Sequence, residues 1–230
     1  MTHRAKQAPL VLCPGDPDRV RLVARDLLDD AEVVTEARGL LGVSGRFDGV
    51  PVTVQATGMG GGSTGIVVHE LIELGARVLI RAGTTGGLQD DVHAGDLVIA
   101  ETVAADDGAG LAIAGDAPHP LDIGVTSALA EAAGTAGRRV HRGPVVSTDV
   151  FYDLAPGRNE AWQARGFLAV EMEAAVIRGL AARHGARAGC VLAVSNTLVG
   201  TGTGWLTPGE RQAAAIDACR VGLQALIRFA

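Results

Sequence analysis

Arg81 is the residue of this chain best placed to bind an anion, because it ends an apolar run and precedes a segment rich in glycine and threonine. The run 78–80 is typical of a strand buried on both faces of a parallel sheet. A guanidinium is rarely left unpaired in a core, and open α/β sheets bind ligands at the carboxyl ends of their strands. The segment 83–87 reads as a turn that offers hydroxyl groups and a backbone accessible to phosphate. An ion pair between Arg81 and a carboxylate is the open alternative.

The sequence PGDPDR at residues 14–19 is a second candidate for anion binding. It follows the apolar strand expected at 9–13 and precedes a segment whose apolar residues follow helical spacing. Arg19 and the backbone N–H groups at the start of this helix are therefore expected together. The alternative is that Asp16 or Asp18 only caps the helix while Arg19 points into solvent.

A glycine loop at residues 60–63 begins a further predicted helix, whose Val67, Leu71 and Leu74 follow helical spacing. A glycine loop alone is weak support for a site, and His69 on this helix is expected at the surface. Arg38 lies between predicted strands and has no evident task within its own chain.

Two carboxylates, Glu171 and Glu173, flank Met172 at the junction of a short strand and an apolar helix. Charged groups so close to an apolar helix predict that one of them holds ligand hydroxyls or an arginine. The alternative is an ion pair that fixes the start of the helix.

Other side chains at strand ends could recognise a planar ligand. Ser195 and Asn196 end a buried strand, and the adjacent Phe151 and Tyr152 follow another, although core packing explains such aromatics equally well. Arg211 lies in the first turn of the last helix, where the helix dipole does not favour a cation, which suggests that it serves the site.

Composition restricts the partners of this site. The chain has 230 residues, 47% of them hydrophobic, and a net charge of −6 without a basic block, which argues against nucleic acid and membrane surfaces. Three separated cysteines without a CxxC motif favour a reduced, cytoplasmic protein. We find no metal-ligand spacing and no signal peptide or membrane-spanning run, so no metal or membrane anchor is expected.

These residues need an α/β scaffold to bring strand ends together. The length and the absence of a linker predict one domain over residues 1–230, with a mixed central sheet flanked by helices. Strands are expected near 9–13, 32–35, 41–47, 52–56, 78–80, 96–103, 140–146 and 188–195, with a hairpin turn at Asp48-Gly49. Helices are expected near 20–28, 58–74, 121–137, 174–184 and from 208 onward, and 107–120 reads as a loop.

The ordered motifs PGDPDR, ARGLLG, TGMGGGST, IRAGTTGG, STDVFY, VEMEAA and VSN extend over nearly the whole chain. Together they resemble the nucleoside phosphorylase family that contains the hexameric bacterial purine nucleoside phosphorylases and the uridine phosphorylases. The resemblance implies phosphorolysis of a nucleoside to free base and ribose 1-phosphate, with inorganic phosphate as co-substrate and no cofactor. It also implies a homohexamer built as a trimer of dimers with shared sites.

The same resemblance implies individual roles. Phosphate would be bound by Gly15, Arg19, Arg81 and Thr84, with Arg38 donated by a neighbouring subunit. The ribose would be held by Met59, Met172, Glu173 and His3, where His3 would also come from a neighbour. The base would meet Phe151, Val170, Glu171, Ser195 and Asn196, and the catalytic set would be Asn196, Arg211, Arg81 and Glu173.

Base choice depends on Asn196, because the resembling purine enzymes usually have an aspartate there that protonates N7. An asparagine can donate to a 6-oxo group and accept from a protonated N7, which favours inosine or guanosine. Uridine phosphorylases have a Gln-x-Arg pair after the Phe-Tyr, which the segment 153–158 lacks. A 6-oxopurine nucleoside is therefore expected, with uridine as the alternative.

Two further departures are that the segment from His3 to PGDP is short and that Gly62 replaces the family's usual proline. Two rival functions remain. A nucleosidase shares the VEMEA-type motif but has no use for three arginines, and a non-catalytic nucleoside-binding protein is separated only by a turnover assay.

Overall fold

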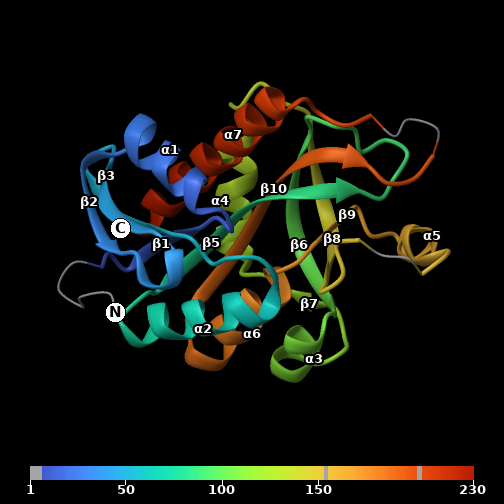
Figure 1. The fold of residues 1–230 in the computed structure, drawn as a ribbon, viewed down its shortest axis with the longest axis horizontal. Helices are drawn as coiled ribbons and strands as arrows, with labels where there is room; N and C mark the ends of the chain where they lie inside the picture. The colour runs from blue at the N-terminus through green and yellow to red at the C-terminus, as the bar shows by residue number, and fades with distance from the viewer. Residues whose placement is uncertain (1–6, 153–154, 201–203) are drawn as a thin grey trace.

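A computed structural model describes residues 7–152, 155–200 and 204–230, and the structural statements below refer to these residues. Five strands form a closed ring, because β5 pairs with β10, β10 with β6, β6 with β8, β8 with β9, and β9 again with β5 (Figure 1). From β5 the sheet continues through β1, β4, β3 and β2, while β7 pairs with β6. The strands are β1 (Leu10–Cys13), β2 (Asp29–Thr35), β3 (Gly42–Phe47), β4 (Val50–Gln55), β5 (Val78–Gly87), β6 (Leu97–Asp106), β7 (His119–Pro120), β8 (Val140–Thr148), β9 (Ala169–Glu171) and β10 (Arg187–Thr197).

Helices cover the sheet on both sides. Figure 1 shows α1, α4 and α7 on one side and α2, α3 and α6 on the other, and two separate apolar clusters fill the space beneath them. The sequence prediction of an α/β fold with a mixed central sheet flanked by helices is confirmed. The helices are α1 (Pro17–Leu27), α2 (Gly60–Glu73), α3 (Gly108–Ala114), α4 (Ile123–Ala133), α5 (Arg158–Ala164), α6 (Ala174–His184) and α7 (Pro208–Leu226).

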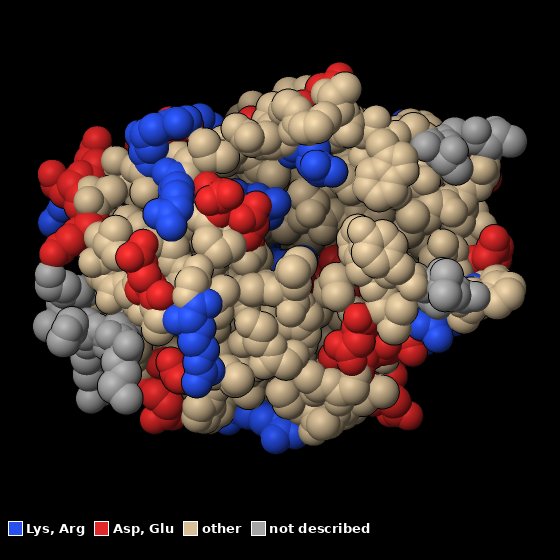
Figure 2. Space-filling model, viewed as in Figure 1, with Lys and Arg blue, Asp and Glu red and all other residues tan. Residues whose placement is uncertain are grey.

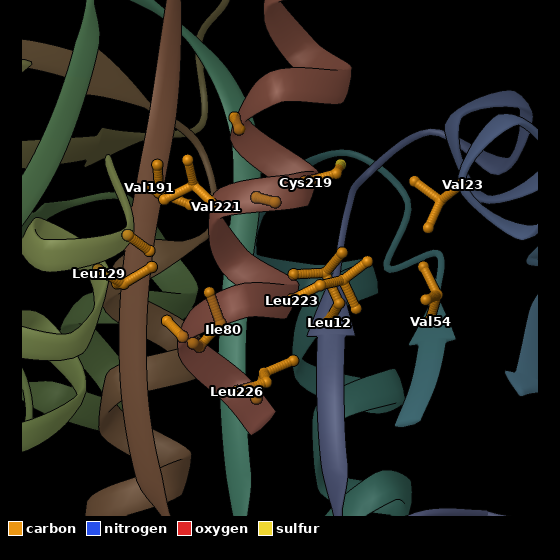
Figure 3. Close-up of a cluster of buried hydrophobic side chains, with 14 of the residues drawn as sticks. Leu12, Val23, Val54, Ile80, Leu129, Val191, Cys219, Val221, Leu223 and Leu226 are labelled. Carbon is orange, nitrogen blue, oxygen red and sulfur yellow. The ribbon is translucent and has the colours of Figure 1, made fainter. Parts of the chain in front are cut away.

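Helix α7 packs very closely on the strands that lead to the candidate site. Leu223 of α7 lies with Leu12, Ile80 and Val191 in one buried cluster (Figure 3). A Cβ atom on Gly222 would lie 2.5 Å from the Leu12 side chain, so only glycine allows this approach. The packing fixes β1 and β5, and with them the residues at their carboxyl ends.

The predicted hairpin turn is confirmed, because Asp48 and Gly49 form it with φ values of 48° and 77°. The helices expected at 174–184 and from 208 onward are present as α6 and α7. Gly185 ends α6 in the left-handed conformation, and Thr207 and Glu210 form the capping box of α7.

Two local predictions are wrong, and one helix was not predicted. Residues 83–87 are not a turn but the continuation of β5, because all of them pair with β10 and Gly86 and Gly87 also pair with β9. The expected loop at 107–120 contains α3, whose first turn is capped by Asp107, and strand β7. Helix α5 was not expected at all.

Candidate active site

The site is built around a buried ion-pair network in which Arg81 meets two carboxylates. Arg81 is only 4% exposed, and its Nε lies 2.5 Å from Glu171 Oε2 while its Nη2 lies 2.5 Å from Glu173 Oε2. Burial by itself would lower the pKa of Arg81, but Glu173 and Glu171 together raise it above its ordinary value. The guanidinium therefore stays charged, and it contacts both carboxyl groups.

Glu171 lies beneath the site rather than at its surface. Its carboxylate accepts hydrogen bonds from Arg81, from the Ser147 hydroxyl, and from the backbone N–H groups of Glu173 and Ala174. The ion pair that fixes the start of α6, one of the two possibilities left open by the sequence, is thus present. Because these contacts all point into the protein, we assign Glu171 a positioning role; the base contact expected for it remains an untested prediction.

Glu173 joins two other elements. Its Oε1 accepts from the N–H of Gly60 at 2.6 Å, which ties the start of α6 to the start of α2, while its Oε2 contacts Arg81. Burial is the main cause that raises its pKa, with Arg81 acting in the opposite direction. The carboxylate has lone pairs left for ligand hydroxyls.

Gly83 makes room for the Arg81 side chain. A Cβ atom at position 83 would lie 2.7 Å from Arg81 Nη2 and 2.8 Å from its Cζ. Gly83, the first glycine in IRAGTTGG, therefore allows the guanidinium to lie along its own strand. The sequence did not reveal this role.

The loop that contains Gly15 lies against the segment that precedes α2, and Arg19 reaches the strand of Arg81. Gly58 N donates to Gly15 O at 3.0 Å, and a Cβ atom on Gly15 would lie 3.0 Å from Gly58 O. Arg19 is half-buried and its Nη1 lies 3.5 Å from Ala82 O, next to Arg81 on β5. Asp16 caps α1, as the alternative for this segment predicted. Arg19 does not point freely into solvent, however, because it also contacts β5.

Arg38 is not brought to this cluster. It is exposed, its backbone adopts φ 57° and ψ 25°, and in the described ranges no side chain is bonded to it. A non-glycine residue in the left-handed region is uncommon and is held there by its surroundings. Its predicted role in a neighbouring subunit stays a prediction.

The predicted base-binding residues line a second part of the site. Ser195 Oγ lies 3.0 Å from Thr85 O and 2.9 Å from Asn196 Oδ1, and Asn196 is 4% exposed. Both of these oxygens are acceptors, so the single hydroxyl proton of Ser195 is donated to one of them at a time. The Nδ2 group of Asn196 takes no part in these contacts.

The remaining predicted residues differ in exposure. Met59, Phe151 and Tyr152 are exposed, with the two rings in edge-to-face contact at 5.0 Å. Arg211 is exposed on α7, and none of the described residues is bonded to its side chain. Three predicted residues, Thr84, Val170 and Met172, are half-buried, and His3 lies outside the described residues.

The cysteines are not candidate nucleophiles. Cys13 and Cys190 flank Arg81 in register on the neighbouring strands, and burial raises the pKa of Cys13 to about 12.

In the described part of the chain no cluster of three His, Cys, Asp or Glu side chains could hold a metal ion. No helix there is long and apolar enough to cross a bilayer.

Figure 2 shows a hollow near the middle of the face seen in Figure 1, close to β5 and the loop before α2. The site thus belongs to an α/β protein whose closed strand ring holds the buried Arg81, with Glu173 joining that arginine to the first residue of α2. Comparison with known proteins gives the family: residues 9–229 match the phosphorylase superfamily, and the chain belongs to it.

Relatives cover nearly the whole chain. A purine nucleoside phosphorylase DeoD-type of Roseobacter denitrificans is 40% identical over 222 residues, which is 95% of this chain and 94% of that protein. A protein of the same description from Jannaschia sp. is 39% identical over 95% of this chain and 94% of its own. A guanosine phosphorylase of Halorubrum lacusprofundi is 37% identical over 83% of this chain and 79% of its own.

Substituting Gly83→Ala tests the geometry around Arg81. The added methyl group displaces the guanidinium, so we expect the dissociation constant for inorganic phosphate, measured by calorimetry, to rise roughly tenfold, as for loss of one charge-assisted hydrogen bond. Gly209→Ala on α7 has no atom within 4 Å of its new Cβ and is the matched control. Unchanged phosphate binding in Gly83→Ala would show that the position of Arg81 does not matter for the anion.

Proposed function

We propose that this protein catalyses the phosphorolysis of a purine nucleoside to free base and ribose 1-phosphate, with a preference for 6-oxopurines. The observation that carries the proposal is the direct contact between Arg81, a cation for phosphate, and Glu173, an acceptor for ribose hydroxyls. The relatives described as purine nucleoside and guanosine phosphorylases support the purine reading, whereas the uridine alternative has no such support.

Phosphate binding is assigned to Gly15, Arg19, Arg81 and Thr84. Arg81 alone is insufficient, because a phosphate dianion beside it also meets the two carboxylates that already neutralise the guanidinium. Arg19 of α1, whose Nη1 lies 3.5 Å from Ala82 O, supplies one further charge. Arg38 is exposed, and none of the described residues is bonded to its side chain; donated by a second subunit, it is the third cation in this proposal.

The ribose is assigned to Glu173 with Met59, Met172 and His3. Glu173 is anchored at both oxygens, by Gly60 N–H and by Arg81, so its orientation is set before substrate arrives. Met59 directly precedes Gly60 and its exposed side chain is available to cover the sugar. Such preorganisation lowers the entropic cost of reaching the reactive geometry.

The chemistry then needs few participating groups. A phosphate oxygen forms a bond to C1′ as the glycosidic C1′–N9 bond breaks and its electron pair leaves with the base. Positive charge develops on the ribose and is stabilised by the Glu173 carboxylate and the phosphate, while Arg81 and Arg19 orient the nucleophile. Inorganic phosphate is the co-substrate, and the proposal needs no cofactor.

Base choice is assigned to Asn196 with Ser195, Arg211, Phe151 and Val170. Asn196 Oδ1, which lies 2.9 Å from Ser195 Oγ, has a second lone pair that accepts from a protonated N7, and Nδ2 is available to donate to a 6-oxo oxygen. Adenosine presents a donor at that position, so the pair of contacts favours inosine and guanosine.

A hexamer made of three dimers is the assembly that this proposal requires, with Arg38 and His3 reaching the neighbouring site. We also propose a cytoplasmic location, supported by three cysteines that are free and buried in the described structure.

The proposal is tested by release of free base from inosine, guanosine, adenosine and uridine, each with and without inorganic phosphate. We expect turnover of inosine and guanosine only when phosphate is present. Release without phosphate would make the protein a nucleosidase, and absence of any turnover would leave only a binding function.

Asn196→Asp tests the reading of base choice. The aspartate can donate a proton to N7 and no longer presents an amide N–H that prefers a 6-oxo oxygen over a 6-amino group. The ratio of kcat/KM for adenosine to that for inosine should therefore rise roughly tenfold or more. Asn159→Asp on α5 makes the same chemical change outside the site and should leave the ratio unchanged. An unaltered ratio in Asn196→Asp would assign base choice to other residues.

A further inference from the structure

Trp205 is an exposed tryptophan that directly precedes a fixed segment. It is 59% exposed, yet the next residue, Leu206, packs against the core and its N–H donates to Ser195 O at 3.0 Å. Thr207 then caps α7. The backbone that follows Trp205 is thus positioned, although its indole is not buried.

The direction of the indole follows from strand pairing. Trp205 forms an antiparallel bridge with Asn196. Residues directly opposite each other in such a pair project from the same face with Cβ atoms about 5 Å apart. Leu206, one residue further along an extended segment, points to the other face and into the core. The indole therefore lies beside the amide of Asn196.

The other tryptophan of the chain shows what a structural indole looks like here. Trp162 is 4% exposed, and its Nε1 donates to Asp106 Oδ2 at 3.2 Å. Trp205 has no such bond within the described residues. Its large apolar ring is exposed to water beside a polar amide, so stacking on a planar ligand would bury apolar area and lower the free energy.

We propose that Trp205 is a specificity-determining residue that stacks on the nucleobase while Asn196 binds the edge of the base. This inference rests on the proposed function. A two-ring purine overlaps an indole over a larger area than a one-ring pyrimidine, so the same contact that strengthens nucleoside binding also favours purines over uracil.

Fluorescence tests the contact directly, because the chain has only two tryptophans. Inosine in phosphate-free buffer should quench the emission of wild-type protein and of Trp162→Phe, which keeps Trp205. Trp205→Phe, which keeps only the buried Trp162, should show no quenching. Equal quenching in wild-type protein and Trp205→Phe would overturn the proposal.

Steady-state kinetics with phosphate supply the second readout. Trp205→Ala should raise KM for inosine on the order of tenfold, the usual effect of removing one base–aromatic stack, with a smaller change in kcat. Trp205→Phe should recover most of the affinity, and both variants should keep the wild-type Tm because the side chain is exposed. An unchanged KM in Trp205→Ala overturns the proposal.

Failure of the proposed function gives a different result. If equilibrium dialysis shows that wild-type protein does not bind inosine at all, the proposed function fails and the inference fails with it. Binding and turnover of inosine without a contribution from Trp205 would overturn only this inference.

Discussion

The buried guanidinium of Arg81 determines much of this structure. A charge that is 4% exposed in the middle of a sheet is tolerated only if anions meet it, and the chain provides Glu171 and Glu173 from a strand and a helix start that lie 90 residues further on. To meet Arg81, β9 must pair with β5 and α6 must begin at the sheet. The closure of the strand ring and the position of the site therefore depend on the same ion pairs.

Two carboxylates only two residues apart have different environments. Glu171 accepts hydrogen bonds from Arg81, Ser147 and two backbone N–H groups, so its remaining capacity for a ligand is small. Glu173 accepts from Arg81 and from Gly60 N–H, next to the exposed Met59. We therefore assign structural support to Glu171 and ligand binding to Glu173, although both hold the same arginine.

Much of the fold was predictable because its signals are local. The hairpin at Asp48-Gly49 and the capping box at Thr207 depend on residues within a few positions of each other. The strand through residues 83–87 was not predictable, since its glycines suggested a turn and only pairing with two distant strands keeps them extended.

Part of the arrangement of the candidate site was predictable. Arg81 and Glu173, both expected in the site, are in contact, and Arg19 reaches the backbone beside Arg81. The contacts of Ser147 with Glu171, and of Trp205 with Asn196, were not foreseen, because they join residues whose spacing in the chain carries no pattern.

The central claim is that the Arg81 network divides into a supporting and a reacting carboxylate, and paired substitution of the two tests it most directly. Glu171→Gln and Glu173→Gln should be compared by Tm and by kcat for phosphorolysis of inosine. We expect Glu171→Gln to lower Tm more than Glu173→Gln does, because it weakens the larger set of buried hydrogen bonds. Glu173→Gln should lower kcat strongly while the protein keeps most of its stability. The reverse pattern, with turnover lost in a fully stable Glu171→Gln and retained in Glu173→Gln, would contradict the account.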